Sequence, residues 1–187
     1  MPAPDDLAAR LAALETEVAA LRAEAEIRQL IGRYMFLCDA PLAEPAMADA
    51  ERAQAIADLY TEDGVWEGVG STHGSAFGRQ NGRGEIRAFF LDFYAREPRL
   101  VFNTHYLCSE QIAVTGGEAE GRWVQFQPWI HADGASLVRS SRLQVRFRRT
   151  HEGWRIAHYR TENLFIAPLA PQWTNFRIER SVLMGAP

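Results

Sequence analysis

The stretch Arg33-Tyr34-Met35-Phe36-Leu37-Cys38-Asp39-Ala40-Pro41 decides how the chain is organised. A long helical pattern runs into this stretch and ends there, because a residue that precedes proline is pushed out of the α region. The helix end carries an aspartate, Asp39, next to the negative end of the helix dipole. That position is unfavourable unless a cation or a protonated histidine lies close to the carboxylate. We therefore expect a partner for Asp39 elsewhere in the chain.

The helical pattern that leads into this stretch has two parts. In the first part, apolar residues recur at alternating steps of four and three, which is a heptad seam: Leu7, Leu11, Leu14, Val18, Leu21 and Ala25. The seam fits either a helix packed on its own domain or an arm that pairs with another subunit. From Ile27 the apolar stripe changes phase and widens, which is typical of a core-facing helix. We interpret residues 1–23 as an N-terminal helical extension.

The middle of the chain predicts two further helices, at about 50–60 and 84–94. Between them, Thr61-Glu62-Asp63-Gly64 predicts a turn into a short strand at 65–67. The glycine-rich residues 68–84 have no phosphate-binding fingerprint and are interpreted as a loop or hairpin.

After Pro98 the pattern becomes that of strands joined by hairpin turns, with candidates at 101–114, 118–131, 137–149 and 153–167. Helices followed by hairpin-linked strands predict an α+β domain with an antiparallel sheet. Strands of this length curve, which leaves a hollow under the helices. The domain is placed at 24–167, and residues 168–187 are expected to form a tail over it.

Composition narrows the function classes. The chain has 187 residues and a net charge of −4, which argues for one domain and against nucleic-acid binding. All 20 basic residues are arginine, which excludes lysine nucleophiles, lysine bases and a P-loop lysine. No apolar run is long enough for a membrane span, and no signal peptide is evident. With two cysteines and no disulfide framework, a cytoplasmic protein is expected.

His105 is the candidate partner for Asp39. In the alternation of its predicted strand, it lies on the more polar face, with Asn103 and Leu107. That face is either exposed to solvent or the wall of a small-molecule pocket. A carboxylate fixes the tautomer of a paired imidazole and strengthens it as a general base. Tyr34 could donate a hydrogen bond to a carbonyl or leaving-group oxygen, or be a core aromatic residue.

Two other strand faces carry candidate side chains. Arg142 and Arg146 alternate along one strand, which indicates either a solvated face or a group that holds a substrate anion. On the preceding strand, Trp123 shares a face with two glutamines and Trp129, which fits an interface or an aromatic-lined pocket. The histidines and cysteines have no metal-ligand spacing, so we expect no metal site.

Several motifs in fixed order resemble the SnoaL-like group of the nuclear transport factor 2-like superfamily. They lie at 27–39, 59–67, 82–90, 104–106, 117–121 and 153–157, so that the resemblance covers about residues 24–167. It implies a cone-shaped α+β barrel, in which a strongly curved, mostly antiparallel sheet wraps three helices around a hydrophobic pocket. The nearest members in character are scytalone dehydratase, hexachlorocyclohexane dehydrochlorinase and bile acid 7α-dehydratase.

The resemblance also implies a site. Those relatives use a His–Asp pair, often with a tyrosine, to remove a proton and expel a leaving group without a cofactor. Tyr34, Asp39 and His105 match that motif. A pocket arginine on the third long strand is also usual, and here Arg142 and Arg146 compete for that role. The substrate-binding residues expected in addition are Trp123, Leu107 and Phe89.

The sequence therefore predicts a cofactor-independent lyase, a dehydratase or a related enzyme, that acts on a hydrophobic cyclic small molecule. The alternatives are a non-catalytic binding or oligomerisation module, and an isomerase or hydrolase on the same fold. In this fold the outer sheet face with Phe102, Tyr106 and Ile112 would need covering, so a homo-oligomer, a dimer or trimer, is expected. The loop at 68–82 and the residues after Asp39 depart from the family pattern near the pocket mouth, so the substrate stays open.

Overall fold

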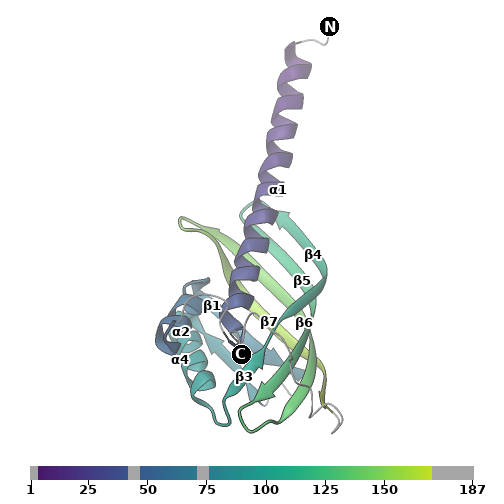
Figure 1. Cartoon of the computed structure of the whole chain (residues 1–187). Coiled ribbons are helices and arrows are strands. Elements are labelled where there is room, and N and C mark those ends of the chain that lie inside the picture. Colours follow the sequence, from purple (N-terminus) through teal and green to yellow (C-terminus); the bar gives the residue numbers. More distant parts are fainter. Residues whose placement is uncertain (1–3, 42–46, 71–75, 170–187) are drawn as a thin grey trace.

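A computed structural model describes residues 4–41, 47–70 and 76–169. Within these ranges three helices accompany seven strands (Figure 1). The helices are α1 (Pro4–Cys38), α2 (Asp49–Ala57) and α4 (Gly82–Ala95). The strands are β1 (Tyr60–Val69), β2 (Arg79–Asn81), β3 (Leu100–Asn103), β4 (Tyr106–Thr115), β5 (Glu118–His131), β6 (Ser136–Thr150) and β7 (Gly153–Pro168). The predicted tail lies outside the described residues, apart from its first two.

The strands form one curled sheet that wraps the helices. Its order is β2-β1-β7-β6-β5-β3, and β4 pairs with β5 beside β3. Among the described strands, β1 and β7 run parallel, and every other pair is antiparallel. In Figure 1 the helices α2 and α4, together with the lower half of α1, lie on the concave side of this sheet. The predicted α+β cone with a mostly antiparallel sheet is confirmed.

Helix α1 has an exposed half and a buried half, as the change of phase at Ile27 predicts. The first half extends beyond the sheet (Figure 1), and its seam residues from Leu7 to Leu21 are exposed. From Ile27 onward one side of the helix is buried, with Ile31 and Tyr34 at 3% exposure. No helix in the described ranges is long and apolar enough to cross a membrane.

The hydrophobic core lies between the helices and the inner sheet face. Its fully enclosed side chains come from every layer and include Ile27 of α1, Ile56 of α2, Ile86 of α4 and Leu143 of β6. Apolar burial of this kind contributes roughly 1.5–3 kcal/mol for each large aliphatic side chain. The core therefore fixes the three helices against the sheet and leaves the pocket between them.

Two strand predictions need correction. The turn predicted at 61–64 is part of β1, which runs on through an irregularity between Tyr60 and Val65. A Cβ at Gly64 would lie 2.9 Å from the Thr61 carbonyl oxygen, so only glycine fits this close approach. The single strand predicted at 101–114 is two strands, and Thr104 and His105 lie in the break between them.

The break and a bulge in β4 also correct the expected outer face. Ser109 has a φ of 56°, and the β4–β5 register shifts between Cys108 and Gln111. The extra residue reverses the alternation, so Ile112 packs against the core instead of facing outward. Phe102 is also buried, which leaves Tyr106 as the exposed member of the three predicted residues. The argument for an oligomer from that set of residues is therefore wrong.

Candidate active site

The C-terminal end of α1 is held by a buried arginine. Arg52 of α2 donates from Nε to the Leu37 carbonyl and from Nη2 to the Asp39 carbonyl, each at 2.6 Å. Its guanidinium also lies 4.0 Å from the centre of the Tyr94 ring. A cation at this position balances the negative end of the helix dipole and satisfies carbonyls that have no partner within the helix. The cation that the helix end requires is Arg52, which the sequence analysis missed.

Asn103 of β3 ties the same helix end to the sheet. Its side-chain Nδ2 donates to the Cys38 carbonyl at 3.1 Å. Its backbone N–H and C=O pair with those of Ala40, both at 2.9 Å, in an isolated antiparallel bridge. Residue 39 therefore has little freedom, and its side chain faces the break between β3 and β4.

Asp39 and His105 lie in direct contact, as the sequence predicts. Asp39 Oδ1 accepts the backbone N–H of His105 at 3.0 Å and lies 2.6 Å from its Nδ1. Both side chains are less than 10% exposed, so water screens the pair little. The two bonds to one oxygen fix both the position of the ring and its orientation.

The hydrogen-bond network defines the tautomer of His105. Nδ1 faces a carboxylate and therefore carries the proton, which leaves a lone pair on Nε2. Gln127 Nε2 lies 2.7 Å from that nitrogen and 3.0 Å from Asn103 Oδ1, and donates to both. Its own oxygen accepts from Gln125 Nε2. The imidazole therefore presents a proton acceptor, occupied by an amide donor in the free protein.

This acceptor opens onto an aromatic pocket between the helices and the sheet. The empty space, part of it open to solvent, is about 550 Å³. The apolar and aromatic lining residues are Tyr34, Cys38, Trp66, Phe77, Phe89, Phe90, Phe93, Tyr94, Trp129 and Tyr159. The polar ones are Asn103, His105, Gln125, Gln127, Arg139 and Thr161. A mostly aromatic wall with few polar groups is the usual composition of a small-molecule site.

Arg139 supplies the cationic group of the pocket. It pairs across the sheet with Gln127, and its guanidinium lies 4.0 Å from the centre of the Trp129 ring. Burial lowers the pKa of Arg139 to about 10, so it is charged at neutral pH. The predicted arginines, Arg142 and Arg146, are exposed on the other face of β6. The expectation that one of them faces the pocket is wrong, because side chains alternate between faces and both are out of phase with Arg139.

The other predicted pocket residues divide. Phe89 lines the pocket, and its ring lies 4.7 Å from that of Trp66. Trp123 does not: it is buried further along β5, where its Nε1 donates to Glu110 at 3.1 Å. Leu107 packs against the core and is not among the lining residues. Trp123 and Gln127 do share the inner face of β5, as predicted. The strand extends beyond the pocket, however, and Trp123 lies in the part that the pocket does not reach.

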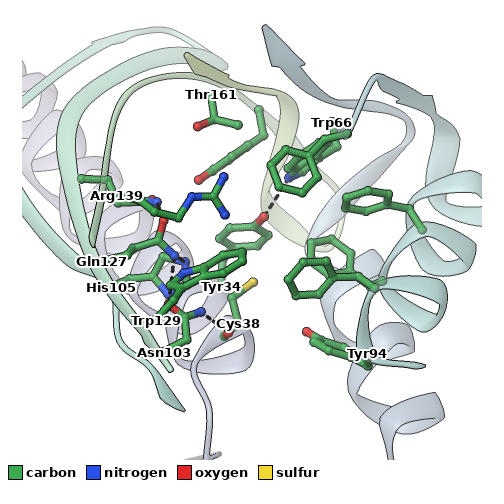
Figure 2. A pocket seen from close by; sticks show the side chains of 16 residues that line it. Tyr34, Cys38, Trp66, Tyr94, Asn103, His105, Gln127, Trp129, Arg139 and Thr161 are labelled. Carbon is green, nitrogen blue, oxygen red and sulfur yellow. Dashed lines mark hydrogen bonds between the residues drawn. The ribbon is translucent and has the colours of Figure 1, made fainter. Parts of the chain in front are cut away.

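Tyr34 lies at the centre of the pocket wall. Its hydroxyl oxygen accepts the indole N–H of Trp66 at 2.9 Å. Figure 2 shows this bond and places Tyr34 between Trp66 and the side that carries His105, Gln127 and Arg139. The sequence-predicted trio is thus assembled around one cavity, with Asp39 behind His105 and outside the lining.

The comparisons with known proteins agree with this architecture. The family of SnoaL-like domains matches residues 19–160. The chain belongs to the SnoaL-like domain family. No curated protein sequence matches it at a significant level.

Solved structures show the fold of the SnoaL-like domain. An NTF2-like protein with a cystatin-like fold from Novosphingobium aromaticivorans is 29% identical, with 88% of this chain and 92% of that chain covered and a TM-score of 0.55. The hexachlorocyclohexane dehydrochlorinase LinA-type3 from Novosphingobium barchaimii is 15% identical, with 81% and 92% covered and a TM-score of 0.62. At these identities the likeness supports the NTF2-like fold.

The SnoaL-like domain holds a second histidine–carboxylate pair outside the pocket. His158 Nε2 lies 2.8 Å from Glu67 Oε1, and Arg146 Nη2 donates to His158 Nδ1 at 2.9 Å. Burial, and then the charges of the two nearby arginines, lower the pKa of His158 against the opposing effect of Glu67. Neither His158 nor Glu67 lines the aromatic pocket. The pair therefore offers a matched control for His105 and Asp39.

No group of three His, Cys, Asp or Glu side chains that could hold a metal ion occurs in the described part of the SnoaL-like domain. The acid–base groups that the pocket itself offers are the His105 imidazole, the Arg139 guanidinium, the Cys38 thiol and the tyrosine hydroxyls.

The buried tyrosines predict alkaline unfolding. Burial raises the pKa values of Tyr34, Tyr60 and Tyr159 well above 10.0, and that of Cys38 from 9.0 to about 12. The unfolded chain releases these protons at lower pH than the folded chain does, so their contribution to stability is present below pH 9 and is lost as the pH rises beyond 10. Each such group lowers the unfolding free energy by about 1.4 kcal/mol per pH unit. Arg139 has the opposite effect on the unfolding free energy, because its pKa is lowered in the folded chain.

Urea denaturation between pH 8 and 11 measures this dependence, and tyrosinate absorbance reports ionisation. Above pH 10 the unfolding free energy of the wild type falls with pH. We expect Tyr34→Phe to make this fall less steep by about 1.4 kcal/mol per pH unit, the contribution of one proton. A stability that is constant to pH 11 in the wild type would contradict the prediction.

Proposed function

We propose that the protein is a cofactor-independent lyase that eliminates a leaving group from a hydrophobic cyclic small molecule, with His105 as the general base. The observation that carries the proposal is the orientation of the imidazole. Asp39 lies 2.6 Å from Nδ1 at the back of the ring, and the lone pair on Nε2 faces an aromatic pocket. A positioned acceptor of this kind contributes about 10²–10⁴-fold to a proton-transfer step.

The proposed reaction begins with proton removal from carbon. Nε2 of His105 takes the proton, the C–H electron pair forms the new double bond, and the leaving group departs with the electrons of its own bond. Asp39 stabilises the imidazolium that forms, as a buried carboxylate does beside a catalytic histidine. Gln127 gives up its bond to Nε2 when the substrate enters. The proton then passes from His105 to the leaving group or to water.

Arg139 and Tyr34 are the proposed electrophilic groups. The charged guanidinium of Arg139, stacked on Trp129, would stabilise negative charge on a substrate carbonyl or on the departing group. Tyr34 is protonated at neutral pH, and burial raises its pKa further, so it acts as a donor and not as a base. Both groups line the same cavity as His105.

The pocket shape supports a flat or cyclic substrate. Trp66, Phe89 and Tyr34 present ring surfaces, and aromatic faces favour stacked or edge-to-face contact with another ring. The similarity in fold to LinA, which is named as a dehydrochlorinase, supports elimination as the reaction class. The substrate of that protein is not transferred to this one.

One observation favours a second candidate, a non-catalytic binding protein. Two polar groups of the pocket that the proposed reaction uses already have partners: Gln127 occupies Nε2 of His105, and Trp66 occupies the Tyr34 oxygen. A ligand-binding domain would retain ligand affinity after His105→Ala and would show no turnover. An enzyme would lose turnover with the same substitution.

The two candidates are separated by a screen in D₂O. Cyclic compounds with a hydroxyl or halide β to an acidic C–H are incubated with the protein, and products are detected by mass spectrometry. A lyase yields alkene or incorporates deuterium at the acidic carbon, and a binding protein does neither. Absence of both changes across the panel, with ligands bound, would replace the proposal by the second candidate.

Arg139 gives a further prediction for this function. Arg139→Met keeps an unbranched side chain at this position but removes the guanidinium and its charge. We expect kcat/KM to fall by about 10²–10³-fold, the usual effect of losing a positioned electrostatic group. Arg142→Met is the matched control, because it removes the same charge from the outer face of the same strand. An equal loss in both variants, measured by steady-state kinetics, would contradict a pocket role for Arg139.

A further inference from the structure

The first half of α1 carries an apolar stripe that its own domain does not cover. Leu7, Leu11, Leu14, Val18 and Leu21 are between 43% and 64% exposed. None of them belongs to the hydrophobic core or packs against it in the described part of the chain. Figure 1 shows this half of the helix extending beyond the sheet. A regular row of exposed large aliphatic side chains marks an interaction surface.

The stripe faces away from the domain. At roughly 100° per residue, Leu14 and Val18 lie on the side of the helix opposite Ile27 and Ile31, which are buried against the sheet and the other helices. The domain therefore cannot cover the stripe without a rotation of α1 that would expose the core.

Beyond Ala25 the same outer side becomes more polar, because Arg28 and Gln29 are exposed there. Phe36 is 56% exposed there, and no atom lies within 4 Å of a Cβ built on Gly32. The heptad stripe therefore ends near Ala25, and the open space at Gly32 lies beyond it.

The charged residues that flank the apolar stripe indicate which partner packs against it. Leu7, Leu14 and Leu21 take the d positions of the heptad, and Leu11, Val18 and Ala25 take the a positions. The flanking g positions are Arg10, Glu17 and Glu24, and the charged flanking e positions are Glu15 and Arg22. In a parallel pair, each g residue faces the e residue five positions later on the other helix. Arg10 then meets Glu15 of the partner subunit, and Glu17 meets Arg22 of the partner subunit.

The antiparallel arrangement matches less well. With the same apolar layers, Arg10 would face Glu24 of the partner subunit, but Glu15 would face Glu15 of the partner subunit and Glu17 would face Glu17 of the partner subunit. Like charges at these positions disfavour pairing. Valine at an a position with leucine at d favours two strands. The charges of the arm therefore favour the parallel orientation, in which no like charges face one another at these positions.

We propose that the first half of α1 is a dimerisation arm, which forms a parallel two-stranded coiled coil with the same helix of a second copy of this chain. The two domains then lie on opposite sides of the paired helices at the same end. With only about three heptads, the association is expected to depend on protein concentration. This assembly is independent of the chemistry in the pocket.

The apolar seam is tested by a pair of neighbouring substitutions. Leu14→Glu places a charge in the seam, and Ala13→Glu adds the same charge on the other side of the helix at an exposed residue. Sedimentation velocity of the full chain is expected to show the wild type and Ala13→Glu at twice the 21.0 kDa chain mass. Leu14→Glu is expected to weaken association at least about tenfold. A monomeric wild type, or a Leu14→Glu mass equal to that of the wild type, would overturn the proposal.

Orientation is tested by charge exchange. The double variant E15R/E17R makes both parallel contacts repulsive and is expected to be monomeric. The quadruple variant R10E/E15R/E17R/R22E restores opposite charges in the parallel pair and is expected to dimerise again. It has the same net charge as the wild type, and in an antiparallel pair it would still face like charges. Failure of the quadruple variant to dimerise, with helicity intact by circular dichroism, would overturn the parallel arrangement.

Discussion

The substitution His105→Ala is expected to lower kcat by about 10²–10⁴-fold on a compound that the elimination screen identifies. The side chain is the proton acceptor of the proposed reaction, and Asp39 behind it cannot replace it because it does not line the pocket. Substrate affinity should change little, since the aromatic wall supplies most of the contact. The loss is therefore expected in kcat, measured by steady-state kinetics with saturating substrate.

Two controls make this result specific. His158→Ala removes the histidine of the other carboxylate pair, on the outer face of the sheet, and is expected to leave kcat within about twofold. Added imidazole should restore part of the activity of His105→Ala, because the substitution leaves a space of its own size beside Asp39. If His158→Ala reduces kcat as much as His105→Ala does, the loss reflects stability and not base catalysis.

The substitution Arg52→Met is expected to lower the unfolding free energy by about 3 kcal/mol, the largest effect we expect from a polar side chain in this protein. Arg52 is 8% exposed and donates to two carbonyls at the end of α1. Methionine fills a similar volume but leaves those carbonyls without their charged donor. Urea denaturation measures the change.

Arg99→Met is the matched control for this prediction. Arg99 pairs with Asp49 on the same helix as Arg52, but its side chain is 55% exposed. An exposed pair contributes about 0–1 kcal/mol, so this variant should be close to the wild type. Arg52→Lys keeps the charge with a single donor group and should recover part of the loss. Equal stability of Arg52→Met and the wild type would show that the helix end does not need its cation.

The end of α1 was the most predictable part of the molecule. Ala40-Pro41 marks the end of the helix, and the misplaced charge of Asp39 calls for a partner, which led to His105. The partner that balances the helix dipole is Arg52, however, and no sequence pattern distinguishes it from other arginines on amphipathic helices. The resemblance to the SnoaL-like group supplied the fold around this contact, including the curvature of the sheet.

The pocket face of β6 illustrates what sequence analysis can miss. Arg142 and Arg146 do share a face, but the apolar residues Leu143, Val145 and Phe147 occupy the other one, and that face is inward. Arg139 is in phase with those three residues, so a basic residue within an apolar alternation was the signal for it. A change of one position moves a side chain to the opposite face, which is why strand assignments alone did not identify the pocket arginine.

The cavity has two chemically different ends, one beside His105 and Gln127 and the other beside Arg139. Beside His105 the cavity has a lone pair that accepts an amide N–H, and beside Arg139 it has a positive charge. A ligand with an O–H or N–H at one end and a carbonyl or carboxylate at the other matches both ends at once. We expect phenols and carboxylated rings to displace the amide and bind head-first in a single orientation, whereas ethers of the same size would not be oriented. In the proposed elimination, this bound orientation would determine which side of the ring loses its proton before any bond breaks.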